Sequence, residues 1–262
     1  MRWCRTRHEG RETYGLVEDE LVLLVEGDPF TGHRETGIRL PLADTALLPP
    51  VFPPTFYAAG YNYAGHNAQA EARTGKPGPA LPKRPETNYR AQSALIGHGA
   101  AIVKPADCTG PFEAEAELVA VIGRELRRCT RDEAAAGLLG WTIGNDVSAR
   151  AWQRADRTFW RAKNSDTFKP MGPWIETAAD PLDPAARTTV TLDGAPVAAF
   201  PTGAMIFDPY DYIREISRYI TLRPGDVLWM GTDAMVEMPA GQTLGIEISG
   251  IGTLANPVTE ER

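Results

Sequence analysis

The alternation of apolar and polar residues along the chain predicts many short strands. Apolar runs bounded by Gly, Pro, Asp or Asn recur through most of the sequence, a pattern typical of β-strands. The first two runs, residues 14–17 and 21–25, flank the acidic turn at 18–20 and predict a hairpin. Further strands are predicted from Phe56 onward and over residues 141–143, 188–192, 196–200, 227–230 and 244–248. Because strands outnumber helices, we expect an irregular β-rich fold rather than a doubly wound sheet.

Three short helices have recognisable start signals. Residues 130–133 (Thr-Arg-Asp-Glu) form a capping-box pattern that opens a helix over 134–139. Ser148 is a candidate cap for a second helix through residues 149–154. Asp208 followed by Pro209 predicts a third helix. Its apolar residues recur at helical spacing and should face the core: Tyr212, Ile213, Ile216, Tyr219 and Ile220.

Proline-rich and glycine-rich segments suggest where the chain divides. Two proline pairs within residues 48–54 cannot continue a helix or a central strand. We therefore predict a small N-terminal domain over residues 1–50 and a second domain over 51–262. Residues 70–86 are polar and lack periodicity, and their position beside His66 favours a mobile lid over 67–87, with simple disorder as the alternative.

The most informative stretch is residues 112–123, which reads F-E-A-E-A-E-L-V-A-V-I-G. On a strand, Glu113, Glu115 and Glu117 share one face. A row of like charges cannot be buried unpaired, so a cation is the simplest partner for it. A solvated helix is the alternative, but the Val-Ala-Val-Ile continuation favours a strand.

Composition and charge narrow the classes of partner. The chain has 27 basic and 34 acidic residues and a net charge of −7, which argues against nucleic acid as a partner. Cys4, Cys108 and Cys129 are an odd number at wide spacing and suggest free thiols in a reducing cytoplasm. Because no window approaches the ~18 apolar residues of a membrane span, we expect no membrane partner.

Several residues carry candidate chemistry, and each has a structural alternative. Glu115, Glu117 and Asp146 offer only oxygen ligands, which suits Mg²⁺, Mn²⁺ or Ca²⁺ better than zinc or copper. Asp146 alone would more simply be a turn or helix-cap residue. Lys163 beside such a metal could stabilise an enolate, and His66 could be a general base, although most lysines are solvated and lone histidines are often structural.

Taken together, six segments resemble the fumarylacetoacetate hydrolase family in identity and order, over roughly residues 50–256. The motifs are G-Y-N-Y-x-x-H (60–66), E-A-E-L-V-A-V-I-G (115–123), N-D-V-S-A-R-x-x-Q (145–153), A-K-N-S-D-T-F-x-P-x-G-P-W (162–174), L-R-P-G-D-V (222–227) and G-T (231–232). The resemblance implies a β-rich α+β fold, a mixed β-roll or β-sandwich, preceded here by the small strand-rich domain. It also implies a homodimer.

The resemblance further implies roles for individual residues. It assigns metal ligation to Glu115, Glu117 and Asp146, with Mg²⁺ or Mn²⁺ as the expected ion, and it places Lys163 near the metal. His66 would act in acid–base chemistry. The substrate site would be lined or supported by Tyr61, Arg150, Gln153 and Thr232. Glu113 precedes the matching motif and is expected in a supporting or surface position.

Two reaction classes are compatible with these residues. The first is a hydrolase that cleaves a carbon–carbon bond in a diketo acid or acylpyruvate-like acid through an enolate. The second is a decarboxylase, hydratase or isomerase of an oxaloacetate-like 2-oxo acid on the same site. A binding protein that keeps the metal without turnover is the third and weakest alternative.

Three departures from the family pattern affect these expectations. Gln69 stands where several members have a glutamate that pairs with the histidine; an amide can orient His66 but stabilises an imidazolium less well. Glu71 is a possible substitute. Residues 88–91 (Asn-Tyr-Arg-Ala) replace a lysine-bearing segment, and residues 233–235 (Asp-Ala-Met) replace Pro-x-Gly. The Gln69 departure favours the second reaction class.

Overall fold

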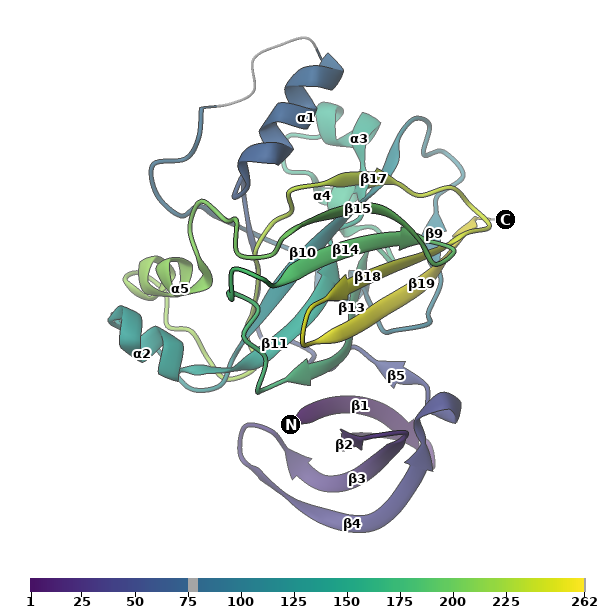
Figure 1. The fold of residues 1–262 in the computed structure, drawn as a ribbon, viewed down its shortest axis with the longest axis vertical. Coiled ribbons are helices and arrows are strands. Elements are labelled where there is room, and N and C mark those ends of the chain that lie inside the picture. Colours follow the sequence, from purple (N-terminus) through teal and green to yellow (C-terminus); the bar gives the residue numbers. More distant parts are fainter. Residues whose placement is uncertain (75–79, 262) are drawn as a thin grey trace.

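The structure, a computed structural model, describes residues 1–74 and 80–261 and confirms a β-rich fold. Within these ranges the strands form two sheets. The main path of the larger sheet runs β4-β3-β2-β1-β13-β11-β10-β16-β6-β7, and the smaller sheet runs β15-β14-β18-β19-β9. Figure 1 shows the first four strands curled into a lobe at one end of the molecule, with the smaller sheet over the other part.

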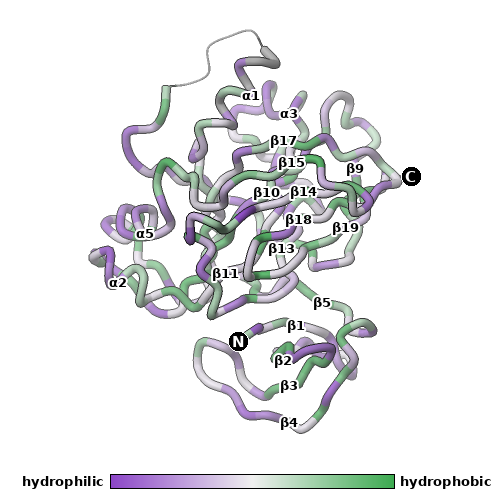
Figure 2. Tube along the Cα trace, in the orientation of Figure 1, coloured by the Kyte–Doolittle hydropathy of each residue, from purple (hydrophilic) through white to green (hydrophobic). Residues whose placement is uncertain are grey.

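The N-terminal strands form a meander that contains the predicted hairpin. Its elements are β1 (Arg2–His8), β2 (Arg11–Glu18), β3 (Leu21–Asp28), β4 (Gly32–Pro41), the 3₁₀ turn η1 (Leu42–Asp44) and β5 (Leu47–Leu48). The hairpin pairs Glu18 with Leu21, and Asp19 adopts the positive φ that such a tight turn requires. Figure 2 shows β3 as a hydrophobic stretch and the edge strand β4 as largely hydrophilic. The charged edge discourages pairing with another chain.

The centre of the larger sheet carries the glutamate stretch as a strand. The central elements are β6 (Phe56–Ala59), β10 (Phe112–Ile122), β11 (Leu138–Asn145), β13 (Lys169–Glu176) and β16 (Val227–Trp229). Strand β10 lies between β11 and β16, and all of its residues are buried. Leu118 and Ala120 pack in one apolar cluster, whereas Val119 and Val121 pack in another. This alternation confirms the strand prediction.

The smaller sheet packs over one face of β10. It contains β9 (Ile102–Lys104), β14 (Arg187–Leu192), β15 (Ala195–Pro201), β18 (Thr243–Ile248) and β19 (Gly252–Glu260). Ile246 and Ile248 of β18 share the apolar cluster that includes Leu118. Short strands complete the larger sheet: β7 (Thr87–Tyr89), β8 (Leu95–Ile96), β12 (Ser148–Ala149) and β17 (Met235–Glu237).

The helices are short and lie at the ends of strands. They are α1 (Ala64–Thr74), α2 (Arg131–Ala136), α3 (Arg150–Ala155), α4 (Trp160–Asn164), α5 (Pro209–Ser217) and the 3₁₀ turn η2 (Gln92–Ala94). The predicted capping box of α2 is present, and Asp208 caps α5 as predicted. In the part of the chain that the structure describes, no helix has the length and apolar character needed to cross a membrane.

Several local predictions were wrong. Helix α1 occupies residues 64–74 and so enters the segment predicted as a loop; residues 75–79 of the predicted lid lie outside the described residues. Residues 138–139 belong to β11 rather than to the preceding helix. Helix α5 ends at Ser217, so helical spacing no longer applies beyond it, and Tyr219 and Ile220 are exposed.

Ser148 was also misassigned. It belongs to β12, and its hydroxyl donates to the carbonyl of Asp146. Helix α3 therefore begins after Ala149 without a side-chain cap. The physical reason is that β12 pairs with the start of β10, and this pairing delays the start of the helix.

Candidate functional site

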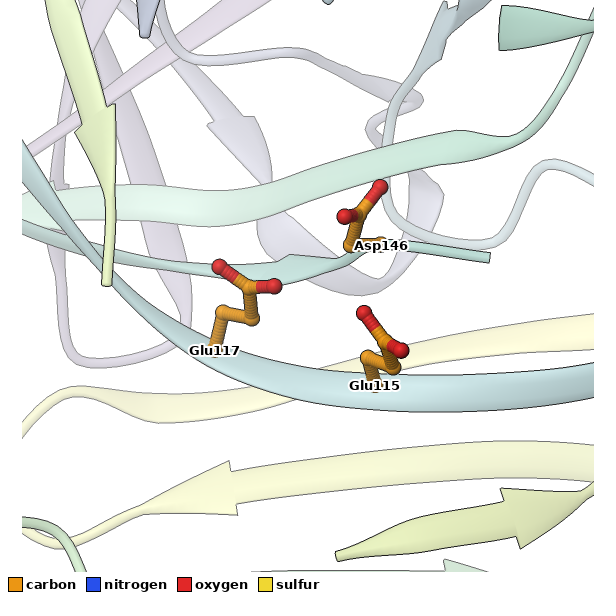
Figure 3. A group of neighbouring side chains, drawn as sticks. All are labelled: Glu115, Glu117 and Asp146. Carbon is orange, nitrogen blue, oxygen red and sulfur yellow. The ribbon is translucent and has the colours of Figure 1, made fainter. Parts of the chain in front are cut away.

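Three buried carboxylates meet at one point of the larger sheet. Glu115 and Glu117 come from β10, and Asp146 follows the last residue of β11. One oxygen from each lies within 4.8 Å of the others. In Figure 3, Glu115 and Glu117 rise from the same strand and Asp146 lies beside them. The structure thus brings together the three residues predicted as metal ligands.

Antiparallel pairing explains why Asp146 reaches this place. The register of β10 and β11 pairs Ala116 with Asn145. The backbone N–H of Asp146 donates to the carbonyl of Glu115 at 3.0 Å. The side-chain oxygen of Asn145 accepts from the N–H of Glu115 at 3.1 Å, which closes the end of the ladder. These bonds fix Asp146 beside Glu115.

Three cationic side chains surround Asp146. Arg90 donates to both of its oxygens, at 3.1 Å from Nε to Oδ1 and 2.8 Å from Nη2 to Oδ2. Lys163 Nζ lies 2.8 Å from Oδ2, and Lys169 Nζ lies 2.7 Å from Oδ1. Burial opposes the ionisation of Asp146, but Arg90, Lys163 and Lys169 outweigh it and hold its pKa well below the usual range.

Both carboxylate oxygens of Glu115 lie beside cationic side chains. Lys163 Nζ donates to Oε2 at 2.6 Å, and Arg150 Nη2 lies 2.7 Å from Oε1. Burial disfavours the carboxylate, yet Lys163 and Arg150 outweigh burial and lower the pKa of Glu115 to about 2. Arg150 Nε also donates to Glu113 at 2.6 Å. Glu113 is therefore a buried supporting residue, and its expected surface alternative is excluded.

Glu117 is the carboxylate with the least compensation. It accepts one hydrogen bond from the N–H of Gly231 at 2.7 Å. Burial and the nearby charges of Asp146 and Glu115 raise the pKa of Glu117 to about 8. An added positive charge between the three carboxylates would favour its ionised form. The all-oxygen donors and this deficit of positive charge at Glu117 fit a hard divalent cation.

A cavity of about 280 Å³ opens beside the carboxylates. Among its lining residues are His66 and Lys163 together with the three acids. His66 lies in the first turn of α1, and its ring meets that of Tyr61 edge to face at 5.4 Å. Burial lowers the pKa of His66 below its usual value, although Glu115 partly offsets this effect. At neutral pH the imidazole is therefore a neutral base.

The cavity is also lined by Tyr61, Gln153 and Thr232. Arg150 lies behind Glu115 and donates a hydrogen bond of 2.8 Å to the side-chain oxygen of Gln153. The Gly231 N–H is used by Glu117, and the Thr232 hydroxyl donates to a backbone carbonyl two residues on. These two donors could bind a carboxylate of the substrate only if each released its present acceptor.

Gln69 lies on α1, and its amide bonds the turn at 233–235, whereas His66 was the expected partner. Its Nε2 donates to the carbonyl of Asp233 at 3.1 Å, and its Oε1 accepts from the N–H of Met235 at 3.2 Å. Both ends of the amide are thus used by the turn between β16 and β17. A Cβ on Gly65 would lie 2.4 Å from Asp233, so the helix and this turn are in close contact. Glu71, the other candidate partner, is exposed.

Sequence reasoning missed two cations, Arg90 and Lys169. Arg90 stands in the segment 88–91 already noted as unusual, but its distance along the chain from Asp146 gave no indication of contact. Lys169 lies at the start of a buried strand beside Phe168 and Pro170. A lysine in such a setting requires an acidic or carbonyl partner, and that was the available signal.

Comparison with known proteins gives a family match over most of the chain. The profile described as "Fumarylacetoacetate (FAA) hydrolase C-terminal" matches residues 55–259. A second profile, "Rv2993c-like, N-terminal", matches residues 1–50. Protein Rv2993c of Mycobacterium tuberculosis is 41% identical over 237 residues, which cover 89% of this chain and 86% of that protein.

Two similar proteins have names that state a reaction. The oxaloacetate tautomerase Fahd2a, mitochondrial, of Rattus norvegicus is 30% identical over 242 residues, covering 86% of this chain and 74% of that protein. The crystal structure of 5-carboxymethyl-2-hydroxymuconate delta-isomerase from Mycobacterium smegmatis has a TM-score of 0.87 and 34% identity and covers 100% of both chains. With the family profile covering residues 55–259, the chain belongs to the fumarylacetoacetate hydrolase family.

Proposed function

We propose that the protein is a metal-dependent hydrolase that cleaves a carbon–carbon bond in a diketo acid or acylpyruvate-like acid. The observation that supports this most is one cavity whose lining combines three buried carboxylates with Lys163 and His66. The carboxylates of Glu115, Glu117 and Asp146 would hold Mg²⁺ or Mn²⁺, with Ca²⁺ as a further candidate. When bound, such a cation polarises a carbonyl oxygen and offsets the negative charge that develops there.

Lys163 and His66 would have separate tasks. The Lys163 ammonium, already within 2.8 Å of two acids, would stabilise negative charge on the substrate oxygen. The neutral imidazole of His66 would take a proton from water as that water adds to the carbonyl carbon. The bond to the neighbouring methylene carbon then breaks, its electron pair forms an enolate, and a returned proton gives a carboxylic acid and a 2-oxo acid.

A second function is favoured by the hydrogen bonds of Gln69. Gln69 is a neutral amide and supplies no charge to His66, and both ends of this amide bond the turn at 233–235. An imidazolium there is less stabilised, which weakens water activation more than it weakens enolate formation. A tautomerase, isomerase or decarboxylase of an oxaloacetate-like acid needs the enolate without the hydrolytic water. The reactions named for the two similar proteins support this alternative.

The experiment that tests both is product analysis by NMR. The purified protein with Mg²⁺ or Mn²⁺ would be incubated with acylpyruvates, a cyclic 1,3-diketone and oxaloacetate, beside a metal-free control. We expect metal-dependent formation of pyruvate and a carboxylic acid from the acylpyruvates. Enol–keto exchange or pyruvate from oxaloacetate alone would transfer the assignment to the second function.

His66→Ala separates the two functions further. If His66 activates water, this variant loses diketone cleavage and retains oxaloacetate conversion. Loss of both reactions would instead assign His66 to a shared proton transfer. Turnover of no oxo acid by the wild-type protein would contradict both functions.

The remaining expectations are part of the same proposal. We propose a small N-terminal domain over residues 1–50, a catalytic domain over 51–262 with a lid within 67–87, a homodimer and a cytoplasmic location. Sedimentation of the purified protein tests the oligomeric state directly.

A further inference from the structure

Lys169 is a buried cation that the proposed reaction does not use. It is the first residue of β13, and its side chain is 0% exposed. Its Nζ lies 2.7 Å from Asp146 Oδ1 and donates to the carbonyls of Phe168 at 2.7 Å and Val147 at 3.3 Å. Among the described residues that line the cavity, Lys169 is absent. The ammonium therefore reaches Asp146 from outside the cavity.

The charge of Lys169 is not needed to neutralise Asp146. Arg90 and Lys163 already contact this carboxylate, and both line the cavity. Burying an ammonium is costly, and a neutral donor would satisfy the two backbone carbonyls equally well. The positive charge itself therefore acts on Asp146, its ion-pair partner.

A positive charge behind a ligand has a definite electrostatic effect. The Lys169 ammonium lies across the Asp146 carboxylate from the place where a divalent cation would bind. Like charges in a buried site repel strongly. The ammonium also offsets part of the negative charge of Asp146, so this carboxylate attracts the divalent cation less strongly. More net positive charge then remains for an anionic substrate in the cavity.

We propose that Lys169 is a positioning residue that acts through Asp146 to weaken the binding of the divalent cation and strengthen that of an anionic 2-oxo acid. This inference rests on the proposed metal-dependent function. It assigns a role to a side chain that touches neither the substrate nor the cation.

Two variants separate the charge of Lys169 from its hydrogen bonds. Lys169→Gln removes the charge and keeps an amide with two N–H donors for the three acceptors, whereas Lys169→Met removes the charge and all donors. In each, Arg90 and Lys163 still compensate Asp146, so we expect the fold to be retained. If Lys169→Met fails to fold, Lys169→Gln decides the outcome.

The measurement is Mn²⁺ binding to the full chain by electron paramagnetic resonance at neutral pH, without substrate. We expect both variants to bind Mn²⁺ about tenfold or more tightly than the wild type. The Michaelis constant for the turned-over oxo acid should rise in the same variants. Lys104→Gln, which changes a half-buried lysine of β9 outside the cavity lining, is the matched control and should leave Mn²⁺ affinity unchanged.

The outcomes distinguish this inference from the proposed function. If the wild type binds Mn²⁺ and both variants bind it equally or more weakly, the role of Lys169 is overturned but the proposed function is not. Weaker binding only in Lys169→Met would mean that the hydrogen bonds of Lys169 matter and its charge does not, which also overturns it. Absence of Mn²⁺ binding by the wild type contradicts the metal-dependent function and this inference together.

Discussion

The two halves of β10 are equally buried but differ in what they bury. In the first half Glu113 and Glu115 pair with cations, and Glu117 accepts a hydrogen bond from the Gly231 N–H. The second half packs Val119 and Val121 between apolar neighbours. Buried ion pairs add little net stability because desolvation offsets their attraction. Apolar burial stabilises a strand directly. The comparison teaches that the charged half serves the site and the apolar half serves the fold.

The largest expected effect comes from removing one charge in the first half. Glu115→Gln deprives Lys163 and Arg150 of their shared carboxylate and weakens metal ligation. We expect the turnover rate to fall by about 10³-fold or more. The thermal unfolding temperature should also fall, because two buried cations lose a partner, although Asp146 still pairs with Lys163 and Glu113 with Arg150. Steady-state kinetics and calorimetry measure the two quantities.

Glu237→Gln is the matched control for Glu115→Gln. Glu237 is exposed on β17 and pairs with Glu113 across the ladder. We expect its loss to leave turnover unchanged. If both variants behaved alike, the distinction between buried and exposed carboxylates at this strand would be wrong.

Lys163→Met should produce the next largest effect. The variant removes the ammonium that faces the cavity while leaving three carboxylates for the cation. We expect the catalytic rate constant to fall by about 10²-fold, with Mn²⁺ affinity retained or increased. Metal titration beside kinetics checks this split. An unchanged rate would remove Lys163 from the mechanism.

Val121→Ala tests the apolar half of β10. Val121 is fully buried in the cluster that contains Trp229. Deleting its methyl groups should lower the free energy of unfolding by about 1–3 kcal/mol and leave turnover unchanged. Chemical denaturation measures the loss, with exposed Val197→Ala of β15 as a control that should change it by less than about 0.5 kcal/mol. Lost turnover in folded Val121→Ala would break the comparison.

The smallest effect is a proton released on metal binding. The pKa of Glu117 is raised to about 8, so without a cation it is protonated at neutral pH, and ligation requires the carboxylate. Mn²⁺ affinity should therefore rise with pH and level off above that pKa, where release disappears. Calorimetry in buffers of different ionisation enthalpy counts the proton. A count of zero at neutral pH would mean that Glu117 is already ionised.

Much of the fold follows from local sequence signals. Alternation predicted β10, the strands predicted at 188–192 and 196–200 correspond to β14 and β15, and Asp208 marked the start of α5. Local signals failed where pairing with a distant strand determined the conformation, as at Ser148. Periodicity likewise could not show that α5 ends before Tyr219, because the spacing of apolar residues continues past the last helical turn.

The candidate site was predictable only in part, for a similar reason. The metal-ligand set and Lys163 followed from motifs, and the structure places them together. Arg90 and Lys169 reach Asp146 through tertiary packing, which spacing along the chain does not reveal. Gln69 was expected to orient His66 because several family members have a residue that pairs with the histidine at this position, but the turn at 233–235 offers Gln69 a donor and an acceptor.

The contact between α1 and the turn at 233–235 has a practical consequence for protein engineering. Gln69 fits this turn through one donor and one acceptor, and Gly65 leaves room for Asp233. A chimera that imports the His66 helix from a relative with a glutamate at position 69 would lose the donor to the Asp233 carbonyl. The helix and the turn should therefore be exchanged as a pair, even though about 160 residues separate them along the chain.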